Sequence, residues 1–150
     1  MIVADVTIAV EAESLSKTRA DVRVRDLVFS VDEPERLGGT NAGPNPVEYL
    51  LAAFIGCINV VAHLTAREMG LDLHHLEITA TGALNPARLF GDTTADRVGF
   101  KTIEVVVRAD TDADSPTLER WLDTVKTRCP VSDNLANPTP VTLVHQPWPR

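Results

Sequence analysis

Residues 40–70 read TNAGPNPVEYLLAAFIGCINVVAHLTAREMG, and this stretch decides the fold. Asn45, Pro46 and Glu48 stand at the N-cap, N1 and N3 positions of a helix, as an asparagine variant of the capping box. Gly70 stands at the C′ position, where glycine commonly ends a helix. Apolar side chains recur between these ends at steps of four and three, namely Leu50, Phe54, Cys57, Val61 and Leu64. The stretch therefore predicts one long, largely apolar helix with a cysteine near its middle.

The chain on either side of this helix alternates between apolar and polar residues, as half-buried strands do. We expect strands at residues 4–10, 20–24, 27–31, 71–84, 100–108 and 141–144. In the fourth of these, Leu76, Ile78 and Ala80 share one side. In the fifth, the apolar run 105–107 predicts burial on both faces.

A second helix is expected over residues 115–129. Ser115 is its predicted cap, with Pro116 at N1, and Pro130 stops it directly after Cys129. The resulting order, β-β-β-α-β-β-α-β, has its strands in runs. It predicts an α+β fold of antiparallel sheets in one domain spanning residues 1–150.

The charge balance argues against two classes of partner. The chain of 150 residues has 14 Lys and Arg against 21 Asp and Glu, which gives a formal net charge of -7. Nucleic acid and anionic membranes both attract basic surfaces, so neither is expected as a partner. Residues 49–66 carry no formal charge, but Gly56, Asn59 and His63 interrupt them, which favours a helix within a soluble protein over a membrane span. The start of the chain lacks the pattern of a secretory signal, so a cytoplasmic protein is expected.

The sequence contains no common cofactor motif. The G-x-S-x-G elbow, the Walker loop and the G-x-G-x-x-G fingerprint are all missing. His74 and His75 are adjacent in a predicted strand and point to opposite faces, so they do not chelate one ion together. His63 and His145 complete no metal-ligand pattern. We expect neither a metal nor a cofactor.

The two cysteines, Cys57 and Cys129, are the candidate reactive groups. A disulfide, a redox pair and two inert core thiols are all compatible with their positions, because free cysteine is commonly a small buried hydrophobe. Cys129 ends a predicted helix, where the helix dipole disfavours a thiolate, so it is the poorer primary nucleophile. It can still act as a resolving thiol, which needs only access to an oxidised partner sulfur.

A reactive thiol needs a neighbour that stabilises its thiolate, usually a cation. Arg19, Arg23 and Arg25 alternate along one face of a predicted strand, with Asp21 among them. This face is either a solvated polar surface or the source of such a cation. Glu48 belongs to the capping box and lies nine positions before Cys57, within reach of a shared pocket.

Three segments together resemble the OsmC/Ohr family of osmotically induced and organic-hydroperoxide-resistance proteins. They are ERLGG, TNAGPNPVEYLLAAFIGC and CPVSDNLANPTPV, at residues 35–39, 40–57 and 129–141. The resemblance covers essentially the whole chain. It implies an OsmC-like α+β fold that intertwines as a homodimer, with the long cysteine-bearing helices at its centre.

The resemblance also implies roles for individual residues. In peroxidase members of the family, the helix cysteine attacks the peroxide and the later cysteine resolves it, which corresponds to Cys57 and Cys129. An arginine from an N-terminal strand, here Arg19 by spacing ahead of Arg23 and Arg25, and a glutamate at the helix start complete the site. Classical hydroperoxide-resistance members have that glutamate directly after the proline. This chain has Val47 there and Glu48 one step later, which turns the carboxylate by about 100° around the helix and resembles the OsmC-like subgroup.

The resemblance therefore implies a cysteine-based peroxidase that reduces organic hydroperoxides to alcohols through a Cys57 sulfenic acid and a Cys57–Cys129 disulfide. An external dithiol, of lipoyl type by resemblance, would reduce that disulfide. An apolar lining from Leu50, Phe54, Ile58 and Trp121 would favour alkyl or fatty-acid hydroperoxides. The alternatives are a non-catalytic OsmC-like module that binds a small apolar ligand at the dimer interface, and two cysteines that serve only in packing.

Overall fold

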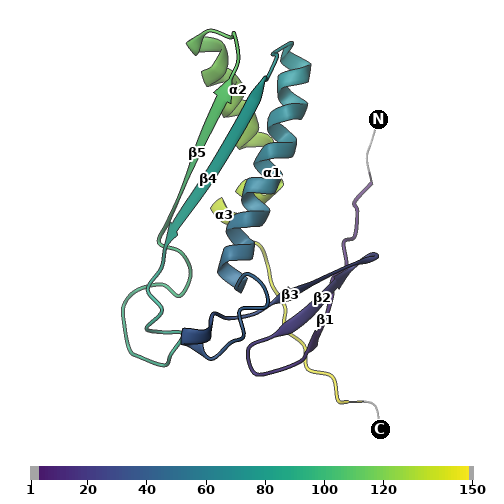
Figure 1. The fold of residues 1–150 in the computed structure, drawn as a ribbon, viewed down its shortest axis with the longest axis vertical. Helices are drawn as coiled ribbons and strands as arrows, with labels where there is room; N and C mark the ends of the chain where they lie inside the picture. The colour runs from purple at the N-terminus through teal and green to yellow at the C-terminus, as the bar shows by residue number, and fades with distance from the viewer. Residues whose placement is uncertain (1–3, 149–150) are drawn as a thin grey trace. The chain divides into compact units, whose positions relative to one another are not determined.

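The computed structural model describes residues 4–148, and the chain divides into two compact units at Ala52–Ala53. The elements in chain order are β1 (Glu11–Ser14), β2 (Ala20–Val24), β3 (Leu27–Val31), the 3-10 helix η1 (Glu35–Leu37), α1 (Pro46–Met69), β4 (His75–Ala83), β5 (Thr102–Asp110), α2 (Ser115–Arg128) and α3 (Pro130–Ala136) (Figure 1). Both sheets are antiparallel, which confirms the predicted α+β class.

The first unit contains a three-stranded sheet in the order β1-β2-β3. In the β2–β3 hairpin, Ala20 lies opposite Val31 and Val24 lies opposite Leu27. Arg25 occupies the turn between them with a φ of 55°. The hairpin lies where the alternation of apolar residues predicted two strands.

The second unit is built on a ribbon of β4 and β5, in which Ile78 pairs with Val107 and Ala80 pairs with Val105. Because alternate residues of a strand share a face, one face of the ribbon carries Leu76, Ile78, Val105 and Val107. This face packs against a core from α1 and α2 that consists of Ile58, Val61, Ala62, Ala66, Trp121, Val125 and Cys129. The indole Nε1–H of Trp121 donates to the Ala62 carbonyl at 3.0 Å, which joins the two helices in the middle of the core.

The ends of α1 have the caps that the sequence predicts. Asn45 Oδ1 accepts from the Glu48 backbone N–H at 2.9 Å, and a Glu48 carboxylate oxygen accepts from the Asn45 N–H at 2.8 Å. Gly70 has a φ of 70°. The Leu71 N–H reaches the Ala66 carbonyl and the Gly70 N–H reaches the Arg67 carbonyl, which together form a Schellman motif.

The buried side of α1 differs from the predicted stripe. Its buried residues are Ile58, Val61, Ala62, Thr65 and Ala66, whereas Leu50 is 39% exposed. These buried residues have helical spacing, but they lie on a side of α1 next to the predicted stripe. The side of α1 that packs against Trp121 and Val125 is the side that is buried. Among residues 4–148, α1 is the one helix long and apolar enough to cross a membrane. Its buried residues pack against Trp121 and Val125 of α2.

Two predicted strands do not form. Residues 4–10 and 141–144 are without regular structure, and their apolar side chains are exposed, as in Val6 at 78% and Leu143 at 95%. Alternating apolar residues become a strand only where a ladder partner is present, and the described part of this chain provides none for these two segments.

Two further predictions need correction. Val106 is 40% exposed, so the run 105–107 is not buried on both faces, because helices cover one face of the ribbon. The cap of α2 is Asp114 rather than Ser115, and its carboxylate accepts from the Thr117 N–H at 2.9 Å.

Candidate functional site

The two cysteines lie side by side in the second unit. Cys57 is half-buried in the middle of α1, and Cys129 is 1% exposed where α2 gives way to α3. Their sulfur atoms are 2.8 Å apart, with the Cys129 thiol as donor and Cys57 Sγ as acceptor, and both cysteines are free. Packing of α2 on α1 thus brings together two thiols that are 72 positions apart in the sequence.

Cys129 belongs to two helix ends at once. It follows the last residue of α2 and is also the N-cap of α3, where its sulfur accepts from the Ser132 N–H at 3.4 Å. Burial raises the pKa of the Cys129 thiol, and its hydrogen bond to Cys57 acts in the same direction. The backbone N–H groups of Ser132 and Val131 oppose this shift. The sequence predicted Cys129 only at the end of a helix, although Pro130 signals the N1 position of another.

An apolar cavity of about 260 Å³ adjoins this sulfur. Its lining comes from α1, β5, α2 and α3 and consists of Phe54, Ile58, Ile103, Val105, Val107, Leu122, Val125, Lys126, Cys129 and Ser132. Phe54 and Ile58 were expected there. Leu50 and Trp121 were also expected in the lining but do not belong to it. Leu50 is an exposed residue of α1, and Trp121 is a core residue bonded to α1. Lys126 is the one charged side chain in the lining, so the cavity suits an apolar molecule.

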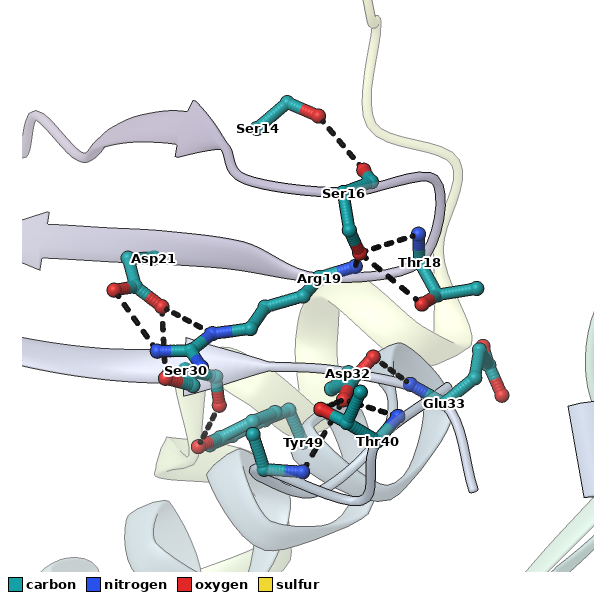
Figure 2. A network of polar contacts seen from close by, with 11 residues as sticks. Ser14, Ser16, Thr18, Arg19, Asp21, Ser30, Asp32, Glu33, Thr40 and Tyr49 are labelled. Carbon is teal, nitrogen blue, oxygen red and sulfur yellow. Dashed lines mark hydrogen bonds and ion pairs between the residues drawn. The ribbon is translucent and has the colours of Figure 1, made fainter. Parts of the chain in front are cut away.

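Arg19 lies in the first unit, directly before β2, and is held by an acidic neighbour (Figure 2). Its Nε and Nη2 atoms donate to the two carboxylate oxygens of Asp21 at 3.0 and 3.2 Å. The Ser30 hydroxyl also donates to Asp21, at 2.8 Å. Hydrogen bonding to Arg19 lowers the pKa of Asp21, and the same contact raises that of Arg19. The guanidinium is therefore fixed and fully charged.

The three arginines do not share one strand face as predicted. Arg23 is an exposed residue of β2, whereas Arg25 belongs to the hairpin turn, because the strand ends at Val24. Glu48 is exposed in the capping box of α1. Arg19 and Glu48 thus belong to the first unit and the cysteines to the second, and the roles of Arg19 and Glu48 toward the thiols stay predictions.

Sequence reasoning missed Asp32, whose side chain is fully buried in the first unit. Its carboxylate accepts from the backbone N–H groups of Glu33, Thr40 and Ala42 and from the Thr40 hydroxyl, at 2.7–3.2 Å (Figure 2). These hydrogen bonds hold the pKa of Asp32 far below its usual range, and the bond from the Thr40 hydroxyl contributes most. The only signal in the sequence is an aspartate at the start of a loop rich in turn residues.

The loop that Asp32 holds leads directly into α1 and is closely packed. A Cβ atom on Gly39 would meet the Glu33 carbonyl oxygen at 1.8 Å, and one on Gly43 would meet the Ser30 carbonyl oxygen at 2.1 Å. Only glycine fits at these positions. The described residues 4–148 contain no group of three His, Cys, Asp or Glu side chains placed to hold a metal ion.

Several solved structures share this fold. An OsmC-like protein from Mycoplasma pneumoniae superposes with a TM-score of 0.78 at 18% identity, over 90% of this chain and 91% of that one. An organic hydroperoxide resistance protein from Elizabethkingia anophelis superposes with a TM-score of 0.64 at 19% identity, over 91% and 93%. An organic hydroperoxide resistance protein OsmC from Legionella pneumophila gives a TM-score of 0.62 at 21% identity, over 88% and 90%.

Comparison of the sequence with protein families agrees with these structural similarities. No curated protein matches it. The model of the OsmC-like protein family, however, matches residues 39–144, a range that contains α1, both sulfur atoms and the whole cavity lining. This match confirms the resemblance predicted from the sequence. The chain belongs to the OsmC-like protein family.

Proposed function

We propose that this protein is a thiol-dependent peroxidase that reduces organic hydroperoxides to alcohols. The observation that carries the proposal is the pair of free thiols, 2.8 Å apart, beside a cavity lined almost entirely by apolar side chains. Two solved structures with this fold, from Legionella pneumophila and Elizabethkingia anophelis, are of organic hydroperoxide resistance proteins, which agrees with a peroxide-related role.

The proposed reaction has three steps. The Cys57 thiolate attacks the distal peroxide oxygen, the O–O bond breaks, and the alkoxide takes a proton and leaves as the alcohol. Cys57 is then a sulfenic acid, which the Cys129 thiol attacks to form a disulfide and release water. An external dithiol reduces this disulfide by exchange and is itself oxidised to a disulfide. The apolar cavity favours a peroxide with an alkyl group over hydrogen peroxide.

The test is to add one equivalent of cumene hydroperoxide to the reduced protein and to measure free thiols and intact mass. We expect the loss of two thiols per chain, with a mass lower by two hydrogens. Cys57→Ser should abolish peroxide consumption, while Cys129→Ser should stop at a sulfenic acid that dimedone traps. Unchanged thiols in the wild type would contradict a peroxidase and favour a non-catalytic module that binds an apolar ligand.

In this proposal Arg19 supplies the cation that stabilises the Cys57 thiolate, and Glu48 helps to hold that arginine. The bidentate contact with Asp21 supports the choice of Arg19, because it keeps the guanidinium ordered. Arg19→Ala should slow peroxide reduction. Arg23→Ala, which removes an exposed arginine from the same hairpin, is the matched control and should leave the rate unchanged. Equal rates for the two variants would remove Arg19 from the site.

We also propose a cytoplasmic homodimer. Two free thiols suit a reducing compartment. Segments 4–10 and 141–144 have strand-like alternation but no ladder partner within the described residues, and Val60 on α1 is 65% exposed. A second copy of the chain would supply cover for such apolar groups. Light scattering after size-exclusion chromatography should give twice the chain mass of 16.3 kDa, and a mass of one chain would contradict the dimer.

A further inference from the structure

Lys126 is the one charged side chain in the lining of the cavity beside Cys129. It lies on α2, four positions after Leu122 and three before Cys129, so these side chains share one side of the helix. Lys126 is exposed, and within the described part of the chain it belongs to no ion pair, whereas the nearby Arg128 is paired with Glu68. An ammonium group that no carboxylate neutralises therefore lies beside the cavity.

The leaving oxygen of the peroxide would be released into this cavity. In the proposed function the alkyl group occupies the cavity and Cys57 attacks the distal oxygen, so the leaving oxygen is the one bonded to the alkyl carbon. Phe54 and Ile58, which lie on either side of Cys57 in α1, both line the cavity. The leaving oxygen thus develops its negative charge among apolar side chains, where an unpaired charge is costly.

Two neutral groups in the lining also hold a proton, the Cys129 thiol and the Ser132 hydroxyl. Transfer of that proton to the alkoxide would leave the negative charge on the donor atom. Burial disfavours this for Cys129 and raises the pKa of its thiol. Transfer from the Lys126 ammonium instead converts two charged groups into a neutral alcohol and a neutral amine, which apolar surroundings favour.

We propose that Lys126 is a further catalytic residue, which donates the proton that the leaving alkoxide takes up. As the bond from Cys57 Sγ to the distal oxygen forms and the O–O bond breaks, an N–H bond of the ammonium breaks and the O–H bond of the alcohol forms. The amine then regains a proton from water, which its exposure allows. This role rests on the proposed function and names the acid that its first step needs.

The test compares two peroxides of similar size whose leaving groups differ in basicity. Cumene hydroperoxide releases an alkoxide, which needs a proton, whereas perbenzoic acid releases benzoate, which is stable as an anion. Lys126→Met removes the ammonium and keeps most of the apolar part of the side chain. In stopped-flow measurements of thiol loss, its rate constant should fall about tenfold or more with cumene hydroperoxide and change less than about twofold with perbenzoic acid. Equal losses with both peroxides, or no loss with either, would overturn the proposal.

Lys126→Arg separates proton donation from charge. It keeps the positive charge and the N–H donors, but a guanidinium does not give up a proton in proteins. Its rate constant with cumene hydroperoxide should therefore stay close to that of Lys126→Met. A wild-type rate constant would show that the charge alone is sufficient and would overturn proton donation.

The matched control is Arg120→Met, which removes a positive charge from an exposed residue of α2 outside the cavity lining. Both of its rate constants should equal those of the wild type, and a loss as large as that in Lys126→Met would overturn a specific role for Lys126. A wild type that consumes neither peroxide would contradict the proposed function itself. A wild type that consumes both, with Lys126→Met equal to it, would overturn the role of Lys126 alone.

Discussion

The indole of Trp121 is the polar link between α1 and α2, and replacing it with phenylalanine tests how the thiol pair is held together. Trp121 is 2% exposed, and its Nε1–H donates to the Ala62 carbonyl at 3.0 Å. Trp121→Phe removes this buried hydrogen bond, at a cost of about 1 kcal/mol. It also removes buried ring atoms equivalent to about two methylene groups, at ~0.8 kcal/mol each. The expected loss in the free energy of unfolding is about 2.5 kcal/mol.

Urea denaturation of the reduced protein, at one fixed protein concentration, measures this loss. With a slope of about 2 kcal/mol per molar urea, the midpoint should fall by about 1 M. Thr65→Val is a useful partner variant, because the Thr65 hydroxyl also donates to the Ala62 carbonyl, at 3.2 Å. The double variant should cost more than the two single variants together, since both side-chain donors to that carbonyl are then lost. A midpoint shift below about 0.3 M for Trp121→Phe at unchanged slope would refute this account of the helix pair.

Three further predictions concern the loop before α1 and the cavity. Asp32→Asn should lower stability at neutral pH. Because the folded-state pKa of Asp32 is depressed, its contribution is present above the ordinary aspartate pKa of about 3.9 and is lost as the pH falls further. The gap in urea midpoint between wild type and variant should therefore narrow below about pH 4, and a constant gap would contradict this. Gly39→Ala should lower the thermal midpoint, because its Cβ would meet a carbonyl oxygen at 1.8 Å, whereas Gly56→Ala, with nothing within 4 Å, should raise stability by about 1 kcal/mol. Val105→Phe should narrow the cavity and lower kcat/KM for cumene hydroperoxide more than for hydrogen peroxide, and equal losses would show that the cavity does not hold the alkyl group.

The sequence predicted those features that depend on neighbouring residues. The capping box at Asn45 and Glu48, the end of α1 at Gly70 and the β2–β3 hairpin are all formed as predicted. Each is determined within a few residues, by a side chain that reaches its own backbone or by a conformation that glycine tolerates. The inward side of β4 was predictable for the same reason, because successive residues of a strand alternate between its faces.

Two segments that have no ladder partner among the described residues were predicted wrongly. Residues 4–10 and 141–144 alternate as strands do, yet they form none, because a strand exists only when a second one pairs with it. The predicted buried side of α1 was wrong for a related reason. Its apolar residues occur nearly all around the helix, so the position of Trp121 and Val125 decides which of them are covered.

The sequence by itself thus determined the family, the helix that carries Cys57 and the position of Cys129 at a helix end. Only the tertiary structure decided that the two sulfurs, 72 positions apart, lie at 2.8 Å, and that Asp32 is buried at the base of the loop. Local patterns fix caps and turns because their partners are close in the chain. The contact between the two thiols and the burial of Cys129 come from the packing of helices, which no short stretch of sequence encodes.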